Sequence, residues 1–331
     1  MNVRLISFSE AGQALAERLA KGLCGEAMRC GQPLQLDAWT KQGFRTAEGL
    51  IFVGAAGIAV RAIAPYVKSK TQDPAVVVVD ETGKFAVSLL SGHLGGANEL
   101  TRQVAALCGA IPVITTATDR NGVFAVDSWA RMQGCVVENP RLIRRISSRL
   151  LAGETIKIRS DWTIAGKPPK GVLLTQEQDC DVLLTLKPTA EDVLRIIPRT
   201  AVLGIGCKKD TRQEAIERVF RQVCAEGNLS AQAVGLVCSI DRKAEEPGLI
   251  DFCRAHQLPF QAWSAEQLGS AEGEFSTSAF VQKTVGVDNV CERSAVLGSG
   301  GKLYRKKYAE NGVTMAVALK PFNPDWRWQH E

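Results

Sequence analysis

The fold is decided by the stretch Leu50-Ile51-Phe52-Val53-Gly54-Ala55-Ala56-Gly57-Ile58-Ala59-Val60-Arg61, where an apolar run meets a glycine turn and then an apolar helical pattern. A strand without polar residues on either face is typical of a parallel sheet covered by helices on both sides. Pro65 ends the helix, because proline lacks the N–H that a helix interior needs. The stretch therefore predicts an α/β protein.

The same alternation of strand and helix continues on both sides of this stretch. Further strands are predicted at 3–8, 76–79, 84–90 and 111–115, and helices at 10–23 and 97–108. The residues Asp80-Glu81-Thr82-Gly83 have the composition of a hairpin turn. We expect mostly parallel sheets flanked by helices, with the functional loops at the carboxyl ends of their strands.

The length of 331 residues exceeds one ordinary hydrophobic core and predicts several domains. We expect an N-terminal α/β domain at 1–135, a smaller middle α/β domain with its linker at 136–198, and a C-terminal α/β domain at 199–331. The third part begins with a new apolar strand, Ala201 to Gly206, which restarts the alternation.

The composition restricts the partners of the chain. It is 45% apolar and 23% charged, has no apolar run long enough to cross a membrane, and begins directly in a strand pattern. We therefore expect a cytoplasmic protein that makes no membrane contact. A net charge of +5, without basic residues interleaved with aromatic ones, argues against nucleic-acid binding and suits an anionic small molecule.

The cysteines and histidines argue against a metal held by the protein. The ten cysteines are scattered and form no CxxC pair, and the three histidines lie far apart in the sequence. The pattern is typical of reduced thiols rather than disulfides. We expect no resident cofactor, and any metal would arrive with the ligand.

The glycine-rich run Ser91-Gly92-His93-Leu94-Gly95-Gly96-Ala97-Asn98 is the strongest candidate site. Ser91, His93 and Asn98, together with the N–H groups of Gly95 and Gly96, can form an oxyanion hole beside a proton-transfer group. Either Asp80 or Glu81 could orient the histidine or act as base; the alternative is that both acids are solvated in the hairpin turn. The alternative is an ordinary helix start, with Ser91 or Asn98 as its cap and His93 exposed.

Two further turns carry polar or flexible residues in the N-terminal part. Gly54 and Gly57 lie at a helix start, where free N–H groups can hold a carboxylate or phosphate; the alternative is a tight connection. The segment Asp119 to Asp127 contains two acids and the amide Asn121; its alternative is an Asx turn followed by a helix cap.

A fourth candidate opens the C-terminal part. Gly206 and Cys207 lead to Lys208 and Lys209 at a helix N-terminus, which suits an anionic ligand, although the lysines can equally be solvated. Patterns of the GxGxxG and GxxxxGK types are absent, which disfavours nucleotide binding.

Taken together, six segments in this order resemble the cobalt-precorrin-5A hydrolase family of the anaerobic cobalamin pathway. They are residues 52–61 with 63–65, 74–81, 91–98, 119–127, 204–207 and 286–292. The resemblance covers nearly the whole chain, and the C-terminal part also resembles a small corrin-pathway protein of aerobic organisms. Asp210 departs from the usual glycine, and Arg293 from the usual proline.

The resemblance implies an activity and a substrate. The enzyme would open the ring A δ-lactone of cobalt-precorrin-5A and release acetaldehyde, giving cobalt-precorrin-5B; the cobalt belongs to this anionic tetrapyrrole substrate. We hypothesise that His93 is the base, that Glu81 or Asp119 orients it, and that Gly95 and Gly96 bind the oxyanion.

The resemblance also bears on partners. Other corrin-pathway enzymes are candidate partners, and the sequence is compatible with a homodimer. An alternative function is a non-catalytic tetrapyrrole carrier that delivers corrin intermediates between enzymes. A nucleotide-dependent enzyme is a weaker alternative, because α/β architecture alone does not determine function.

Overall fold

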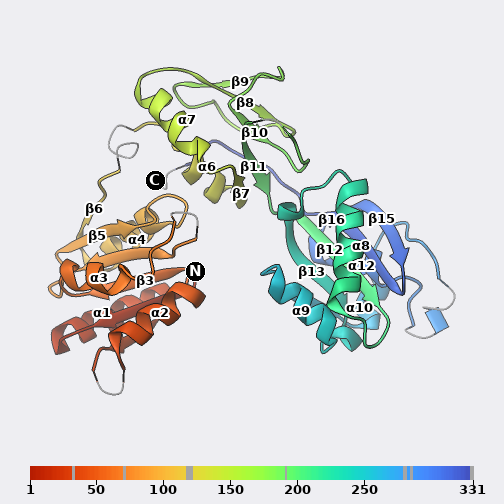
Figure 1. Cartoon of the computed structure of the whole chain (residues 1–331), viewed down its shortest axis with the longest axis horizontal. Coiled ribbons are helices and arrows are strands. Elements are labelled where there is room, and N and C mark those ends of the chain that lie inside the picture. Colours follow the sequence, from red (N-terminus) through yellow and green to blue (C-terminus); the bar gives the residue numbers. More distant parts are fainter. Residues whose placement is uncertain are drawn as a thin grey trace.

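Three β-sheets follow one another along the chain in the computed structural model, which describes residues 1–31, 34–69, 72–116, 122–190, 192–278, 282–283 and 286–328 (Figure 1). The N-terminal sheet is drawn in red and orange, the middle sheet in yellow-green, and the C-terminal sheet in green to blue. Helices flank the sheets, and the predicted fold class, multidomain α/β, is confirmed. Within the described ranges, no helix combines the length and apolarity that crossing a membrane would require.

The N-terminal sheet has the strand order β2-β1-β3-β4-β5-β6. Its strands are β1 (Val3–Ser7), β2 (Glu26–Arg29), β3 (Gly49–Val53), β4 (Ala75–Val79), β5 (Phe85–Leu90) and β6 (Ile111–Val113). Its helices are α1 (Glu10–Leu23), α2 (Leu36–Thr46), α3 (Ala56–Ile63) and α4 (Ala97–Cys108). Along β3, Ile51 and Val53 enter one core while Leu50 and Phe52 enter the other, so an unbroken apolar strand is buried on both faces.

The direction of the sheet reverses at one hairpin. Strands β1 to β4 run parallel, β5 is antiparallel to β4, and β6 is parallel to β5. Leu90 at the end of β5 therefore pairs with Val76 near the start of β4. The loops after β5 and β6 consequently lie at the opposite edge of the sheet from the loops after β1, β3 and β4.

The middle sheet has the order β7-β11-β10-β8-β9. Its elements are β7 (Cys135–Glu138), β8 (Ile156–Ser160), β9 (Val172–Leu174), β10 (Val182–Leu184), β11 (Leu194–Pro198) and the helices α6 (Val126–Met132) and α7 (Leu142–Leu151). Two segments that the sequence places in the outer domains pack into this middle core. Phe124 and Trp129 come from the N-terminal side, and Trp326 comes from the C-terminal end. The predicted domain boundaries themselves stay predictions.

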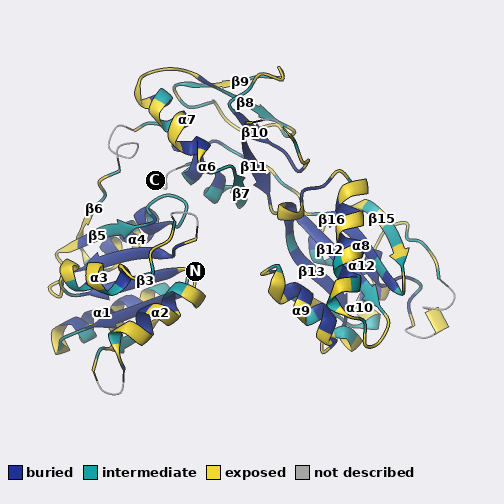
Figure 2. Ribbon diagram, viewed as in Figure 1, coloured by how far each residue is buried: buried dark blue, intermediate teal, exposed yellow. Residues whose placement is uncertain are grey.

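The C-terminal sheet has the order β14-β13-β12-β16-β15. Its strands are β12 (Ala201–Cys207), β13 (Val234–Ile240), β14 (Phe260–Trp263), β15 (Lys302–Glu310) and β16 (Val313–Leu319). Around it lie α8 (Gln213–Glu226), η1 (Ala231–Ala233), η2 (Asp241–Lys243), α9 (Pro247–Ala255), α10 (Ala265–Gly269) and α12 (Cys291–Ser299). Figure 2 shows buried residues along β12 and β13, as expected for strands covered on both faces.

Candidate active site

His93 and Asp127 form an ion-pair contact between the N-terminal sheet and the middle core. Nδ1 of His93 lies 3.6 Å from Oδ2 of Asp127, and the two side chains are 16% and 5% exposed. A carboxylate at Nδ1 favours the tautomer that carries its proton there, in which Nε2 is the basic nitrogen. The pair can therefore act as an oriented base.

The loop that carries His93 is held by its own backbone. The N–H of Gly96 donates to the carbonyl of His93 at 3.0 Å, and the N–H groups of Ala97 and Asn98 donate to the carbonyls of Ser91 and Gly92 at 3.1 and 2.9 Å. The N–H of Gly96 is thus used within the loop, and the predicted role of Gly96 as an oxyanion donor stays a prediction. The N–H of Gly95 has no acceptor among the described residues.

Asn98 is buried rather than open to a ligand. Its Oδ1 accepts a hydrogen bond from Ser88 Oγ at 2.7 Å, and its Nδ2 donates to Thr116 Oγ1 at 3.2 Å. Asn98 is 4% exposed, and its two hydrogen bonds link α4 to β5 and to the segment after β6. Asn98 therefore supports the loop, and its contact with a substrate stays a prediction.

The loop of residues 91–98 meets α6 in a contact that we call the seam. Leu94 packs against the middle core, and Arg131 of α6 lies against Gly96, where a β-carbon would overlap its guanidinium. Gly96 also has a φ of +85°, a conformation that favours glycine. Glycine is required there both for the backbone turn and for the approach of the arginine.

Glu81 lies far from His93 in the structure, and its predicted role in orienting the histidine stays a prediction. It occupies the β4–β5 hairpin turn and accepts a hydrogen bond from Ser9 Oγ at 2.6 Å. The six residues of β5 separate that turn from the seam, a distance of about 20 Å at roughly 3.4 Å per residue. Asp127 takes the place at the imidazole that was predicted for Glu81 or Asp119. Asp119 and Asn121 lie outside the described residues.

Comparison with known proteins identifies the family. Residues 38–119 match the family model "Cobalamin synthesis G N-terminal", and residues 201–318 match "Cobalamin synthesis G C-terminus". The protein named cobalt-precorrin-5A hydrolase in Salmonella typhimurium LT2 is 34% identical, with 96% of this chain and 97% of that protein covered. The chain belongs to the cobalt-precorrin-5A hydrolase family.

Other relatives of the cobalt-precorrin-5A hydrolase family extend the comparison. The protein of that name in Priestia megaterium is also 34% identical, over 85% of this chain and 80% of that protein. The crystal structure of a cobalamin biosynthesis protein G homolog from Sulfolobus solfataricus is 24% identical, covers 97% of both chains and has a TM-score of 0.43. The two matched family models leave residues 120–200 between them, and this interval contains α6 with Asp127 and Arg131.

Gly54 and Gly57 lie at the same sheet edge as Glu81, away from the seam. The N–H of Gly54 donates to the carbonyl of Val79 at 2.8 Å, and Gly57 is exposed in the first turn of α3. The structure does not bring either glycine to His93. If this member of the hydrolase family uses them, it uses them at a different edge of the N-terminal sheet.

Lys208 and Lys209 lie in the C-terminal sheet, where they follow β12. That strand begins three residues after β11 ends and is seven residues long, so the lysines are about 23 Å from the middle sheet at roughly 3.3 Å per residue. Both lysines are exposed, Gly206 faces Thr314, and the N–H of Lys208 donates to the carbonyl of Gly312 at 3.1 Å. Their predicted contact with the substrate stays a prediction, and the structure separates them from His93.

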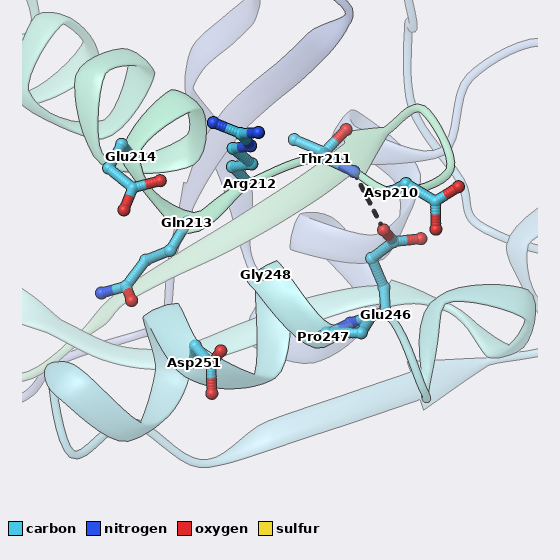
Figure 3. A pocket seen from close by; sticks show the side chains of 9 residues that line it. All are labelled: Asp210, Thr211, Arg212, Gln213, Glu214, Glu246, Pro247, Gly248 and Asp251. Carbon is cyan, nitrogen blue, oxygen red and sulfur yellow. Dashed lines mark hydrogen bonds between the residues drawn. The ribbon is translucent and has the colours of Figure 1, made fainter.

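A cavity of about 580 Å³ lies next to these lysines, between the starts of α8 and α9 (Figure 3). Glu246 accepts a hydrogen bond from the N–H of Thr211 at 3.1 Å. The remaining charged side chains of its lining are Asp210, Arg212, Glu214 and Asp251. Four carboxylates and one guanidinium disfavour a polyanionic ligand in this cavity.

Cys207, beside the same lysines, is not an activated nucleophile. Burial raises the pKa of its thiol, and the positive charge of Lys243 only partly opposes this effect. The thiol is therefore protonated at neutral pH. Of the candidate positions that the structure describes, only the loop of residues 91–98 combines a titratable side chain, a partly enclosed location and a charged partner from another core.

Proposed function

We infer that the chain is a cobalt-precorrin-5A hydrolase of cobalamin biosynthesis and that its reaction takes place at the seam. The observation that carries this proposal is the His93–Asp127 pair, because opening a lactone with water requires an oriented base. The name and 34% identity of relatives that align over most of their length support the same activity.

The proposed mechanism begins with water. Nε2 of His93 takes a proton from a water molecule, whose oxygen attacks the lactone carbonyl; the N–H of Gly95 donates to the developing oxyanion. The acyl C–O bond then breaks, and the histidine returns its proton to the released alkoxide. The products of this step are a carboxylate and a hydroxyl group on the two-carbon unit.

A second step releases acetaldehyde. Deprotonation of the hydroxyl group lets its oxygen form the aldehyde carbonyl while the adjacent carbon–carbon bond breaks. The electron pair of that bond passes to the meso carbon of the conjugated macrocycle, which is then protonated. His93 serves as the base again, so one residue supports both steps.

The substrate brings its own metal and charge. In this proposal the cobalt remains in the macrocycle as part of the substrate, and the protein supplies no cofactor. We also propose a cytoplasmic location, since all ten cysteines are free thiols, as is usual in a reducing compartment. Other corrin-pathway enzymes are the proposed source and destination of the tetrapyrrole.

Acetaldehyde release tests the proposal directly. The purified chain, given cobalt-precorrin-5A without oxygen, should release one equivalent of acetaldehyde, and His93→Gln should lower the rate by about 10²-fold or more. Asp127→Asn should lower it as well, because the imidazole loses its orienting carboxylate. The control His256→Gln removes a histidine that contacts Glu217 at 2.7 Å in the C-terminal part, and should leave the rate unchanged.

Two outcomes would contradict the proposal. Recovery of intact cobalt-precorrin-5A after binding to the unaltered chain would support a tetrapyrrole carrier instead of an enzyme. Normal turnover by folded His93→Gln would remove the histidine from the mechanism, although the hydrolase activity would stand.

A further inference from the structure

Arg131 is a half-buried cation that has no counter-ion among the residues that the structure describes. It follows Asp127 by one turn of α6, and its guanidinium lies against the backbone of Gly96. Among the described residues it forms no hydrogen bond or ion pair, and the carboxylate of Asp127 is directed to His93. Arginine in a partly enclosed position normally has a carboxylate or phosphate partner, because its loss of hydration must be offset.

Ser91 provides a second, independent sign of a missing ligand. The residue is 8% exposed, and within the described part of the chain its Oγ has no hydrogen-bond partner. A β-carbon at Gly95 would overlap the side chain of Ser91, just as one at Gly96 would overlap Arg131. Two adjacent glycines therefore lie against Ser91 and Arg131.

Besides the N–H of Gly95, the backbone of the loop offers little to an anion. The N–H groups of Gly96, Ala97 and Asn98 are used by carbonyls within the loop. A bound anion at the seam would therefore depend on a side chain, and Arg131 offers a planar fork that matches the two oxygens of a carboxylate.

We propose that Arg131 binds a carboxylate of the substrate beside His93, with Ser91 Oγ as a supporting donor. This inference rests on the proposed function, since the ligand is a carboxylate of the tetrapyrrole. The group is either an acetate or propionate at the rim of the macrocycle or the carboxylate formed when the lactone opens. Either source places the lactone next to the imidazole.

Kinetics of Arg131→Met and Arg131→Lys test this role. If the arginine holds a rim carboxylate, Arg131→Met should raise KM by about 10- to 100-fold with little change in kcat. If it holds the carboxylate as it forms, kcat should fall by a similar factor and KM should change little. Arg131→Lys should recover only part of the loss, because lysine lacks the fork. Arg144→Met, which alters an exposed arginine of α7, is the matched control.

Guanidinium rescue separates binding from a structural role. Added guanidinium should restore part of the activity of Arg131→Ala, and it should not restore activity to His93→Ala. If Arg131→Met folds and its KM and kcat are unchanged, the inference is overturned. If Arg131→Met does not fold, the inference is overturned by unchanged KM and kcat in Arg131→Lys together with failed guanidinium rescue of Arg131→Ala.

Equilibrium binding keeps the inference separate from the proposed function. Cobalt-precorrin-5A can be titrated by its absorbance into the unaltered chain and into Arg131→Met. If neither protein turns the substrate over, the hydrolase proposal fails, while weaker binding by Arg131→Met alone would still support the carboxylate site. Equal binding with equal turnover would contradict the site and leave the hydrolase proposal intact.

Discussion

Trp326 stacks on Trp129, with ring centroids 5.4 Å apart and ring planes 17° apart. The same tail segment accepts a hydrogen bond from Trp129 Nε1 through the carbonyl of Asp325 at 2.6 Å. Gln133 adds two more: its Oε1 accepts from the N–H of Asp325, and its Nε2 donates to Asp325 Oδ1. The end of the chain therefore holds the helix that carries Asp127 and Arg131.

Removing the tail aromatic should loosen this helix. Trp326 is 6% exposed, so Trp326→Ala should lower the free energy of unfolding by about 3–5 kcal/mol. Acetaldehyde release should fall too, because α6 positions Asp127. Urea unfolding and turnover measure the two effects. Trp263→Ala, in the C-terminal sheet, is the control that removes a tryptophan without touching α6; normal turnover by Trp326→Ala would show that α6 is held without the tail.

Two glycines at the ends of α4 should differ in their tolerance of a side chain. Gly96 and Gly109 have φ values of +85° and +77°, and only Gly96 has a neighbour that a β-carbon would meet. Gly109→Ala should cost about 1–2 kcal/mol of stability from the backbone alone, and Gly96→Ala about 1–3 kcal/mol more from the overlap with Arg131. Urea unfolding of both variants tests this difference. Equal costs would mean that the guanidinium moves away freely.

Glu81→Gln should leave catalysis unchanged. The carboxylate lies at the sheet edge opposite His93, and its hydrogen bond from Ser9 Oγ can be accepted by a glutamine oxygen as well. Both kcat and KM for acetaldehyde release should therefore match the unaltered chain, whereas Asp127→Asn should not. A loss of turnover in Glu81→Gln comparable with that of Asp127→Asn would require a different arrangement of the hairpin.

Stability should decrease at alkaline pH because of the buried thiols. Burial raises the pKa of Cys291 to about 12, while a thiol in an unfolded chain has a pKa near ~8.5. Between these two pH values the Cys291 thiol keeps its proton in the folded state and loses it in the unfolded state. The contribution of this thiol to the free energy of unfolding is therefore complete below pH ~8.5 and is lost as pH rises toward 12.

The expected slope for this one thiol is about 1 kcal/mol per pH unit. It can be measured as the difference in unfolding free energy between the unaltered chain and Cys291→Ala from pH 8 to 10, since the other titrating groups are common to both. Cys24→Ala removes an exposed thiol and serves as control. A difference that does not change with pH would contradict the assigned cause.

Local patterns in the sequence were sufficient to predict the α/β class, because β1, β3, β4 and β5 are mostly apolar runs. The edge strand β2 carries a charged residue at each end and was not predicted. The hairpin at residues 80–83 was also predictable. One reversal at this hairpin moves the loops after β5 and β6 to the edge opposite Gly54 and Glu81. The turn has a local sequence signal, whereas the edge at which a later loop lies depends on the direction of every strand before it.

The partners at the seam were harder to predict, since they depend on contacts between different cores. Asp127 was part of a segment singled out for its acids, yet nothing local distinguishes it from Asp119 as the partner of His93. Arg131 lies in an ordinary helical pattern, and only the packing of α6 against Gly96 marks it. Trp326 stacks on Trp129, and the adjacent Asp325 accepts a hydrogen bond from Trp129 Nε1. These contacts join residues almost two hundred positions apart in the sequence.

The return of Trp326 to the middle core has a consequence for biosynthesis. The N-terminal sheet has its own two cores in which to fold. The middle core includes Trp326, which leaves the ribosome almost two hundred residues after Trp129. The helix that carries Asp127 is therefore fully supported only after Trp326 has been made, so a chain cut before Trp326 carries the histidine without a fully supported partner.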